Sequence, residues 1–148
     1  MKIQTQYFGE IDIHDDQRIT FPTGIPGFQT ETDFVLLNFD ENPAFQLLQS
    51  ITTAALAFVV INPFQFVTDY EIKLDEQLIK QLQIDEEADV LLLAFVTLND
   101  ALKSSTANLQ APIVVNQKRQ LAKQFITHDS QYSTRELIFT TLSKAGEV

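Results

Sequence analysis

Short β-prone segments separated by turn-forming residues fill most of this chain, and this pattern constrains its fold more than any other feature of the sequence. Alternation with polar neighbours, typical of half-buried strands, occurs at Ile3, Thr5 and Tyr7, at Ile11 and Ile13, and at Ile19 and Phe21. Gly9 permits a bend between the first two of these segments. Residues 22–27 (PTGIPG) are dense in turn formers and predict a loop.

The same pattern continues toward the C-terminus. It predicts strands over residues 33–39, 45–50, 56–61, 88–98, 111–115 and 121–126, and one more where Tyr70, Ile72 and Leu74 alternate with polar residues. Residues 40–43 and 62–63 contain prolines that end strands, and residues 116–119 predict a hairpin connection. The run at 88–98 (ADVLLLAFVTL) is continuously apolar, which is typical of a strand that is buried on both faces.

Two segments have helical spacing instead. Asp75 is a good N-cap, and Leu78, Ile79 and Leu82 after it share one helical face, which predicts a short helix. Ser133 and Glu136 have capping-box spacing before an apolar stretch, which predicts a C-terminal amphipathic helix, although residues 139–142 are also compatible with a strand.

These elements predict the fold class. Eight or nine strands, one or two short helices and no regular βαβ alternation indicate an all-β, mostly antiparallel fold, a small β-barrel or a sandwich. A length of 148 residues fits one domain over residues 1–148, with residues 132–148 as a C-terminal tail. The apolar fraction of 45% is sufficient for a buried core and excludes wholesale disorder.

The chain is strongly acidic. It has 20 acidic and 10 basic side chains, and residues 1–100 carry 17 and 4 of these, whereas residues 101–148 carry 3 and 6. Such a surface repels phosphate, so we expect no direct binding of nucleic acid. An acidic surface suits a basic protein partner, or it serves solubility as a solvated acidic face. The charge difference between residues 1–100 and 101–148 forms a surface dipole only if the fold places these two parts on different faces.

The sequence contains few features that indicate a cellular compartment. The chain has no cysteine, which excludes disulfides and thiolate chemistry and fits a reducing compartment. The first twenty residues contain no apolar stretch like a signal peptide, and the longest apolar run, residues 90–96, is far shorter than the roughly 18 residues that span a bilayer. We therefore expect a cytoplasmic protein without membrane contact.

Candidate catalytic or metal-binding residues are not apparent. His14 and His128 lack metal-ligand spacing, and the acidic run at 85–89 lacks the pattern of a calcium loop. The glycines are too scattered for a phosphate cradle, and Ser104 and Ser105 lie outside any nucleophile-elbow context. The sequence therefore predicts no enzyme, no metal and no cofactor, with a small-ligand-binding barrel or an unrecognised hydrolase kept as an alternative.

Aromatic residues around Pro63 are the first candidates for partner binding. Phe64, Phe66 and Tyr70 follow a predicted strand that the proline ends, so they either anchor a protein interface at the barrel rim or close the end of the core. The second candidate loop is 106–112, in which Asn108 is also suited to bonding the backbone locally.

An ordered set of short motifs across residues 1–132 resembles the family of the bacterial flagellar assembly factor FliW. The matching elements are residues 1–5 (MKIQT), 7–11 (YFGEI), 19–22 (ITFP), 24–28 (GIPGF), 34–37 (FVLL), 48–50 (LQS), 57–64 (AFVVINPF), 69–70 (DY), 106–109 (TANL) and 111–116 (APIVVN). Each motif alone is weak, whereas their order over nearly the whole chain is specific.

The resemblance implies a small β-barrel-like fold and no catalysis. It also implies a partner switch, in which a protein that is monomeric when free binds flagellin in the cytoplasm. When flagellin is secreted, the released protein binds the RNA-binding regulator CsrA and relieves repression of flagellin translation. The alternative is an acidic secretion chaperone or adaptor for flagellin that has no RNA-regulator partner.

The partner-binding residues expected on this basis are Phe64, Phe66, Asp69, Tyr70 and Asn108. We expect the aromatic members to form an apolar surface for the amphipathic helices of flagellin, so that replacing Phe64 and Phe66 by alanine weakens flagellin binding without unfolding. The acidic surface is expected to meet CsrA, whose RNA-binding surface must be basic.

Overall fold

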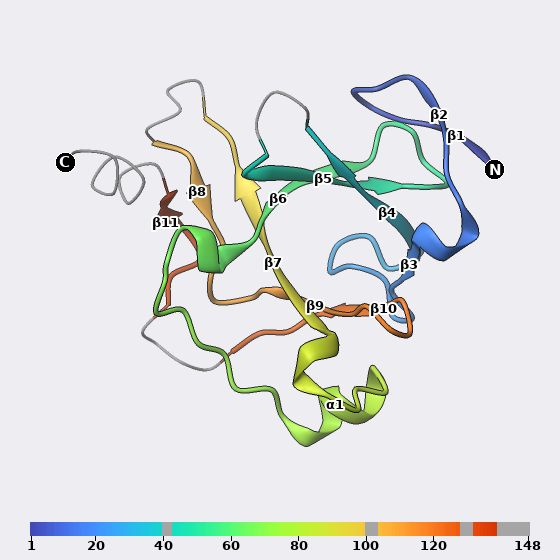
Figure 1. Cartoon of the computed structure of the whole chain (residues 1–148). Coiled ribbons are helices and arrows are strands. Elements are labelled where there is room, and N and C mark those ends of the chain that lie inside the picture. The colour runs from blue at the N-terminus through green and yellow to red at the C-terminus, as the bar shows by residue number, and fades with distance from the viewer. Residues whose placement is uncertain (40–42, 100–103, 128–131, 139–148) are drawn as a thin grey trace.

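The computed structural model describes residues 1–39, 43–99, 104–127 and 132–138 (Figure 1). Its strands are β1 (Lys2–Gln4), β2 (Glu10–Asp12), β3 (Arg18–Thr20), β4 (Asp33–Asn38), β5 (Phe45–Ser50), β6 (Ala57–Ile61), β7 (Val90–Thr97), β8 (Thr106–Ala107), β9 (Ile113–Asn116), β10 (Leu121–Gln124) and β11 (Glu136–Leu137). The helix α1 spans Glu76–Gln81, and the short 3-10 turns are η1 (Asp15–Gln17), η2 (Pro63–Gln65) and η3 (Glu87–Asp89).

Seven of the strands close into a barrel. Their order is β7-β6-β5-β4-β3-β10-β9, and β9 pairs back onto β7. All of these pairings are antiparallel except the one between β3 and β10, where Thr20 lies opposite Leu121. The prediction of an all-β, mostly antiparallel, barrel-like fold is confirmed.

The barrel interior is filled by side chains. All seven barrel strands contribute to one buried cluster, which consists of Ile19, Phe21, Ile25, Phe34, Leu48, Val60, Leu93, Ile113, Val115 and Ala122. The rings of Phe21 and Phe34 meet edge to face with centroids 5.2 Å apart. An interior of this kind is a packed core, as expected for a small barrel.

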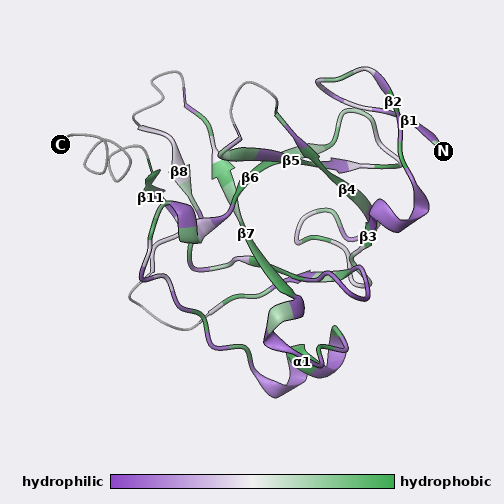
Figure 2. Ribbon diagram, viewed as in Figure 1, coloured by the Kyte–Doolittle hydropathy of each residue, from purple (hydrophilic) through white to green (hydrophobic). Residues whose placement is uncertain are grey.

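Strand β7 is buried on both of its faces. Leu93 points into the barrel interior, whereas Leu92 and Ala94 belong to a second cluster on the outside of the barrel wall. This outer cluster also contains buried residues of the segments before and after α1 and of the chain around β8. Hydrophobic colour runs along β7 in Figure 2. The prediction made from the continuous apolar run is confirmed.

The N-terminal hairpin of β1 and β2 covers another part of the barrel wall. Ile3 and Ile13 pack with Val35 of β4 in a third buried cluster. Gly9 has a φ of +66°, so the predicted bend between the two strands is present. The first strand is shorter than predicted: it ends at Gln4, and Tyr7 is exposed in the hairpin connection.

Helix α1 begins as predicted, but the strand expected just before it does not form. The Asp75 carboxylate accepts a hydrogen bond from the Leu78 backbone N–H at 2.7 Å, as an N-cap does. Residues 70–74 are extended and bury alternate side chains, yet they pair with no described strand. Alternating burial reports packing on one face, whereas a strand also needs a backbone partner, which the sequence pattern does not reveal.

The C-terminal region differs from its prediction. Glu136–Leu137 form the short strand β11 on β8, where Glu136 lies opposite Ala107. The prediction of a helix that begins after Ser133 is therefore wrong at its start. Ile138, which follows β11, is buried and helical, and residues 139–148 of the predicted helix lie outside the described part of the chain. The Ser133 hydroxyl accepts from the Arg135 backbone N–H, so it stabilises a local turn. Neither β8 nor β11 was expected, since each has only two residues.

The fold separates the acidic and basic parts of the sequence only partly. The hairpin turn between β9 and β10, which forms where it was predicted, carries Lys118 and Arg119. It lies beside the acidic segment after α1: Lys118 Nζ is 3.8 Å from the Asp85 carboxylate, and the Gln117 backbone N–H donates to the Asp89 carbonyl. Basic residues of the second part thus meet acidic residues of the first.

A buried glutamine fixes the loop after β5. The Gln49 side chain is fully buried, and its amide nitrogen donates to the carbonyls of Ser50 (3.0 Å), Ala54 (3.2 Å) and Leu56 (3.2 Å). Its oxygen accepts from the Gln6 backbone N–H at 3.0 Å. One side chain therefore ties the N-terminal hairpin and the β5–β6 loop to the barrel.

We predict that Gln49→Ala lowers the free energy of unfolding by about 2 kcal/mol, because the fully buried side chain is lost together with its hydrogen bonds to the Ser50, Ala54 and Leu56 carbonyls and to the Gln6 N–H. The matched control is Gln46→Ala on the same strand. Among the described residues, the Gln46 side chain bonds the exposed Asn38 side chain, and its loss should change stability by less than about 0.5 kcal/mol. Urea unfolding followed by circular dichroism measures both values. Equal effects of the two changes would contradict the role given to Gln49.

Candidate protein-binding groove

The 3-10 turn η2 contains Phe64 and ends at Phe66, and it places these two rings in different environments. Asn62 caps the turn, its side-chain oxygen accepting from the Phe64 backbone N–H at 3.0 Å, and Pro63 occupies the first position of the turn. Phe64 is 43% exposed, whereas Phe66 is 4% exposed and packs against the Phe45 ring. Of this pair, only Phe64 presents its ring to solvent.

Tyr70 is a core residue with a polar end. Its ring is 3% exposed and lies 4.7 Å from the Tyr132 ring and 5.7 Å from the Phe64 ring, centroid to centroid. Its hydroxyl donates to the Leu109 carbonyl at 2.6 Å. Burial, and to a lesser extent the neighbouring Tyr132, raises the pKa of Tyr70, so the hydroxyl stays a donor at neutral pH.

The other two predicted residues lie nearby in different roles. Asp69 is exposed beside Tyr70. The Asn108 side-chain oxygen accepts from the backbone N–H groups of Gln110 (3.2 Å) and Ala111 (3.0 Å), which is the local backbone bonding that the sequence suggested. The structure thus brings Phe64 and Tyr70 into contact, and Asp69 precedes Tyr70 on the surface. Asn108 shapes the turn next to the carbonyl that binds Tyr70.

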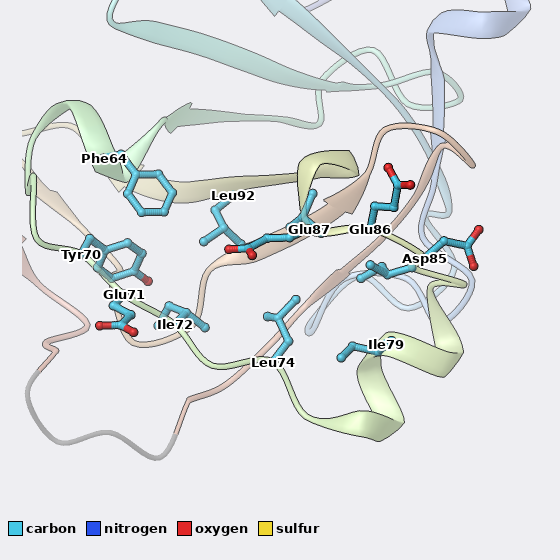
Figure 3. Close-up of a pocket in the computed structure, with 12 residues that line it drawn as sticks. Phe64, Tyr70, Glu71, Ile72, Leu74, Ile79, Asp85, Glu86, Glu87 and Leu92 are labelled. Carbon is cyan, nitrogen blue, oxygen red and sulfur yellow. The ribbon is translucent and has the colours of Figure 1, made fainter.

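Phe64 and Tyr70 line one end of a groove of about 620 Å³, which we call the acidic groove (Figure 3). Besides Tyr70, its apolar lining consists of Phe64, Ile72, Leu74, Ile79, Ile84, Val90 and Leu92. Its acidic lining consists of Glu71, Asp85, Glu86 and Glu87. The floor is thus part of the outer face of β7, and acidic residues border it.

One lip of the groove is the extended segment 70–74. It is fixed at one end by the Tyr70 hydroxyl and by the Tyr132 hydroxyl, which accepts from the Glu71 backbone N–H at 2.8 Å. At the other end Asp75 caps α1. Between these anchors, Ile72 and Leu74 turn half-buried side chains toward the groove.

The opposite lip is the turn that follows α1. Gln83 adopts a φ of +55°, and the Asn116 side chain donates to the carbonyls of Leu82 (2.8 Å) and Gln83 (3.0 Å). The Asp89 backbone N–H bonds the Glu86 carbonyl in η3. This lip is therefore fastened to the end of β9, independently of the first lip.

Most of the acidic charge on the groove is uncompensated. Glu71, Glu86 and Glu87 are exposed and have no ion pair with a described basic residue, and only Asp85 meets a lysine, Lys118, at 3.8 Å. In the view of Figure 3 the Glu87 side chain extends toward Leu92, whereas Asp85 and Glu86 point outward. The arrangement suits a ligand that is apolar on one side and cationic at its edges.

Sequence reasoning did not find this groove. The alternation at 70–74 and the acidic run at 85–87 were both visible, but nothing in the sequence shows that the two segments line the same groove. Among the described residues, no three His, Asp or Glu side chains are grouped so that they could hold a metal ion. Within the same residues, no helix has the length and apolar character needed to cross a membrane.

Comparison with known proteins gives a consistent result. The family model "FliW protein" matches residues 2–138. A flagellar assembly factor FliW of Oceanobacillus iheyensis is 44% identical over 99% of this chain and 100% of its own length. The flagellar assembly factors FliW of Geobacillus kaustophilus and Bacillus subtilis are 47% and 45% identical over 94% and 93% of this chain, and over 96% of their own lengths.

Comparison of the fold with solved structures agrees with the sequence comparisons. A solved structure, described as the crystal structure of the flagellar assembly factor FliW, superposes with a TM-score of 0.88 at 45% identity, covering 93% of this chain and 96% of that one. The identity is spread over nearly all of both chains, as the resemblance of ordered short motifs predicted, and the chain belongs to the FliW family.

Proposed function

We propose that this protein is a non-enzymatic, cytoplasmic flagellar assembly factor that binds flagellin and, when it is free of flagellin, binds and antagonises the translational regulator CsrA. The observation that carries the proposal is the match to the FliW family over residues 2–138, with relatives of 44–47% identity that are named flagellar assembly factors. The surface supports it, since it offers the exposed aromatic ring of Phe64 and acidic residues that have no ion pair among the described residues.

The apolar contribution to flagellin binding falls on Phe64. An amphipathic helix needs an exposed apolar surface to bury its stripe, and Phe64 is the aromatic residue of η2 that provides one. Phe66 and Tyr70 contribute indirectly, because their buried rings support the segment from which Phe64 projects.

The acidic surface offers a route to CsrA antagonism. A basic surface that holds RNA depends on attraction to phosphate, which dominates the affinity of such complexes and weakens with salt. A protein of net charge −10 that docks beside this surface lowers the local potential and repels incoming phosphate without covering the RNA site.

A small ligand inside the barrel is not favoured, because apolar side chains fill the barrel interior. The remaining alternative is an acidic flagellin adaptor without an RNA-regulator partner. A pull-down with purified CsrA at moderate salt discriminates between this adaptor and the partner switch, since only the partner switch predicts a complex.

We predict that Phe64→Ala weakens binding of monomeric flagellin about 5- to 30-fold, because an exposed aromatic anchor at an interface contributes this much when truncated. Isothermal titration calorimetry measures the change. Phe28→Ala is a closely matched control: Phe28 is 42% exposed and its ring meets Phe58 at 5.7 Å, as the Phe64 ring meets Tyr70. Equal losses for both variants would contradict the assignment.

Phe66→Ala is unsuitable for that test. Because Phe66 is buried in the outer cluster, its truncation should lower the free energy of unfolding by about 3–5 kcal/mol. The structure buries Phe66, so we now expect the double replacement of Phe64 and Phe66 to destabilise the domain rather than to leave its folding unchanged.

We predict that this protein displaces RNA from CsrA through its charge. The contact is first mapped by hydrogen exchange, and then four acidic residues within it are changed to lysine. RNA displacement, measured by gel shift at saturating protein and about 0.1 M salt, should fall sharply in every variant that still binds CsrA. A variant that binds CsrA and still displaces RNA fully would rule out the electrostatic route.

A further inference from the structure

We propose that the acidic groove is the docking site for one amphipathic α-helix of a protein partner, and that the apolar stripe of this helix is flanked by lysine or arginine residues. The inference deepens the proposed function, on which it rests for the identity of the protein that supplies the helix. It assigns the position of the site on this chain and the chemistry of the segment that fills it.

The floor of the groove sets the apolar requirement. Leu92 and Val90 of β7 form its base, and half-buried side chains on both lips, including Ile72, Leu74 and Ile84, continue the apolar surface. A volume of about 620 Å³ is in the range of sites that bury a substantial ligand, and it accommodates apolar side chains from successive turns of a helix.

The same floor favours a helix over an extended segment. Its side chains are apolar and offer no partner to backbone N–H and C=O groups. An extended peptide placed on them would leave backbone groups unpaired in an apolar environment, which is costly. A helix bonds its own backbone internally, so it can lie on Leu92 and Ile72 and present only side chains.

The acidic residues set the charge requirement, because they lie on both lips. Glu71 belongs to the first lip, and Asp85, Glu86 and Glu87 belong to the second. A helix in the groove therefore passes between carboxylates, and basic residues on either side of its stripe would meet them. Acidic flanks would be repelled, so the rim also selects against amphipathic helices of the opposite charge.

The groove is formed before the ligand arrives. The first lip is anchored through Tyr70 and Asp75, and the second through Asn116. Between its anchors, the first lip forms no hydrogen bond from Ile72, Lys73 or Leu74 to another described residue. Its position there depends on side-chain packing alone, so small changes of groove width break no backbone hydrogen bond.

The test uses the whole protein and a synthetic peptide of about four helical turns, with leucines at i, i+3, i+4 and i+7 spacing and lysines on both sides of the leucine stripe. A scrambled peptide of the same composition and a peptide with glutamate in place of lysine are the controls. In about 0.1 M NaCl we expect the designed peptide to bind at least about 10-fold more tightly than either control.

The protein variant is Glu71→Lys with Glu87→Lys, which reverses one charge on each lip. Its matched control is Asp15→Lys with Asp16→Lys in η1, which changes the net charge equally on exposed residues outside the groove. We expect the groove variant to lose about 10-fold in peptide affinity and the η1 variant less than about 2-fold. Hydrogen-exchange protection by the peptide should fall on residues 70–74 and 84–87.

The inference is overturned if the scrambled peptide binds as well as the designed one, if both protein variants lose affinity equally, or if protection falls elsewhere. Flagellin and CsrA then separate this inference from the proposed function. Partner binding that the groove variant retains in full overturns the groove assignment alone. A wild-type protein that binds the peptide in the groove but neither partner overturns the proposed function alone.

Discussion

Pairing of β7 with three neighbours is the constraint on which the rest of the structure depends. β7 bonds β6 on one edge, and on the other it bonds β9 along its first half and β8 near its end. The pairing with β9 closes the barrel, and closure leaves β7 with one face toward the interior and one toward the outer cluster. Leu93 and Leu92 therefore anchor two separate cores, and the outer one carries the segments that build the groove.

The elements predicted correctly from the sequence are those whose signals are local. Asp75 and the apolar residues after it specify α1 within about two turns, and the continuous apolar run specifies a strand buried on both faces. Errors occur where pairing decides the outcome. Residues 70–74 alternate like a strand but pair with no strand in the described part of the chain. Glu136–Leu137 form a strand because β8 is adjacent, although their local spacing suggests a helix.

The candidate site was predictable only in part, for a similar reason. The Asn62-Pro63 pair indicates a turn that carries aromatic residues, but which ring is exposed depends on the wall behind the turn. Phe66 faces the outer cluster and Phe64 does not. The groove itself is a tertiary product, because its lips are separated by α1 in sequence and are brought together by Tyr132 and Asn116 from later parts of the chain.

The acidic side chains and the apolar side chains of the groove lie in different environments, so neither set destabilises the free protein strongly. The carboxylates of Glu71, Glu86 and Glu87 are exposed, so water solvates them, and the lack of an ion pair with any described basic residue costs little stability. The apolar residues beneath are half-buried, and β7 packs them from below. A helix that covers the floor removes water from the apolar side chains and from the acidic rim together. Because the dielectric falls at the rim, each charge interaction there becomes stronger as the apolar contact forms. Affinity therefore requires the apolar stripe and the basic flanks on the same segment, since neither alone satisfies both the apolar floor and the acidic rim of one groove.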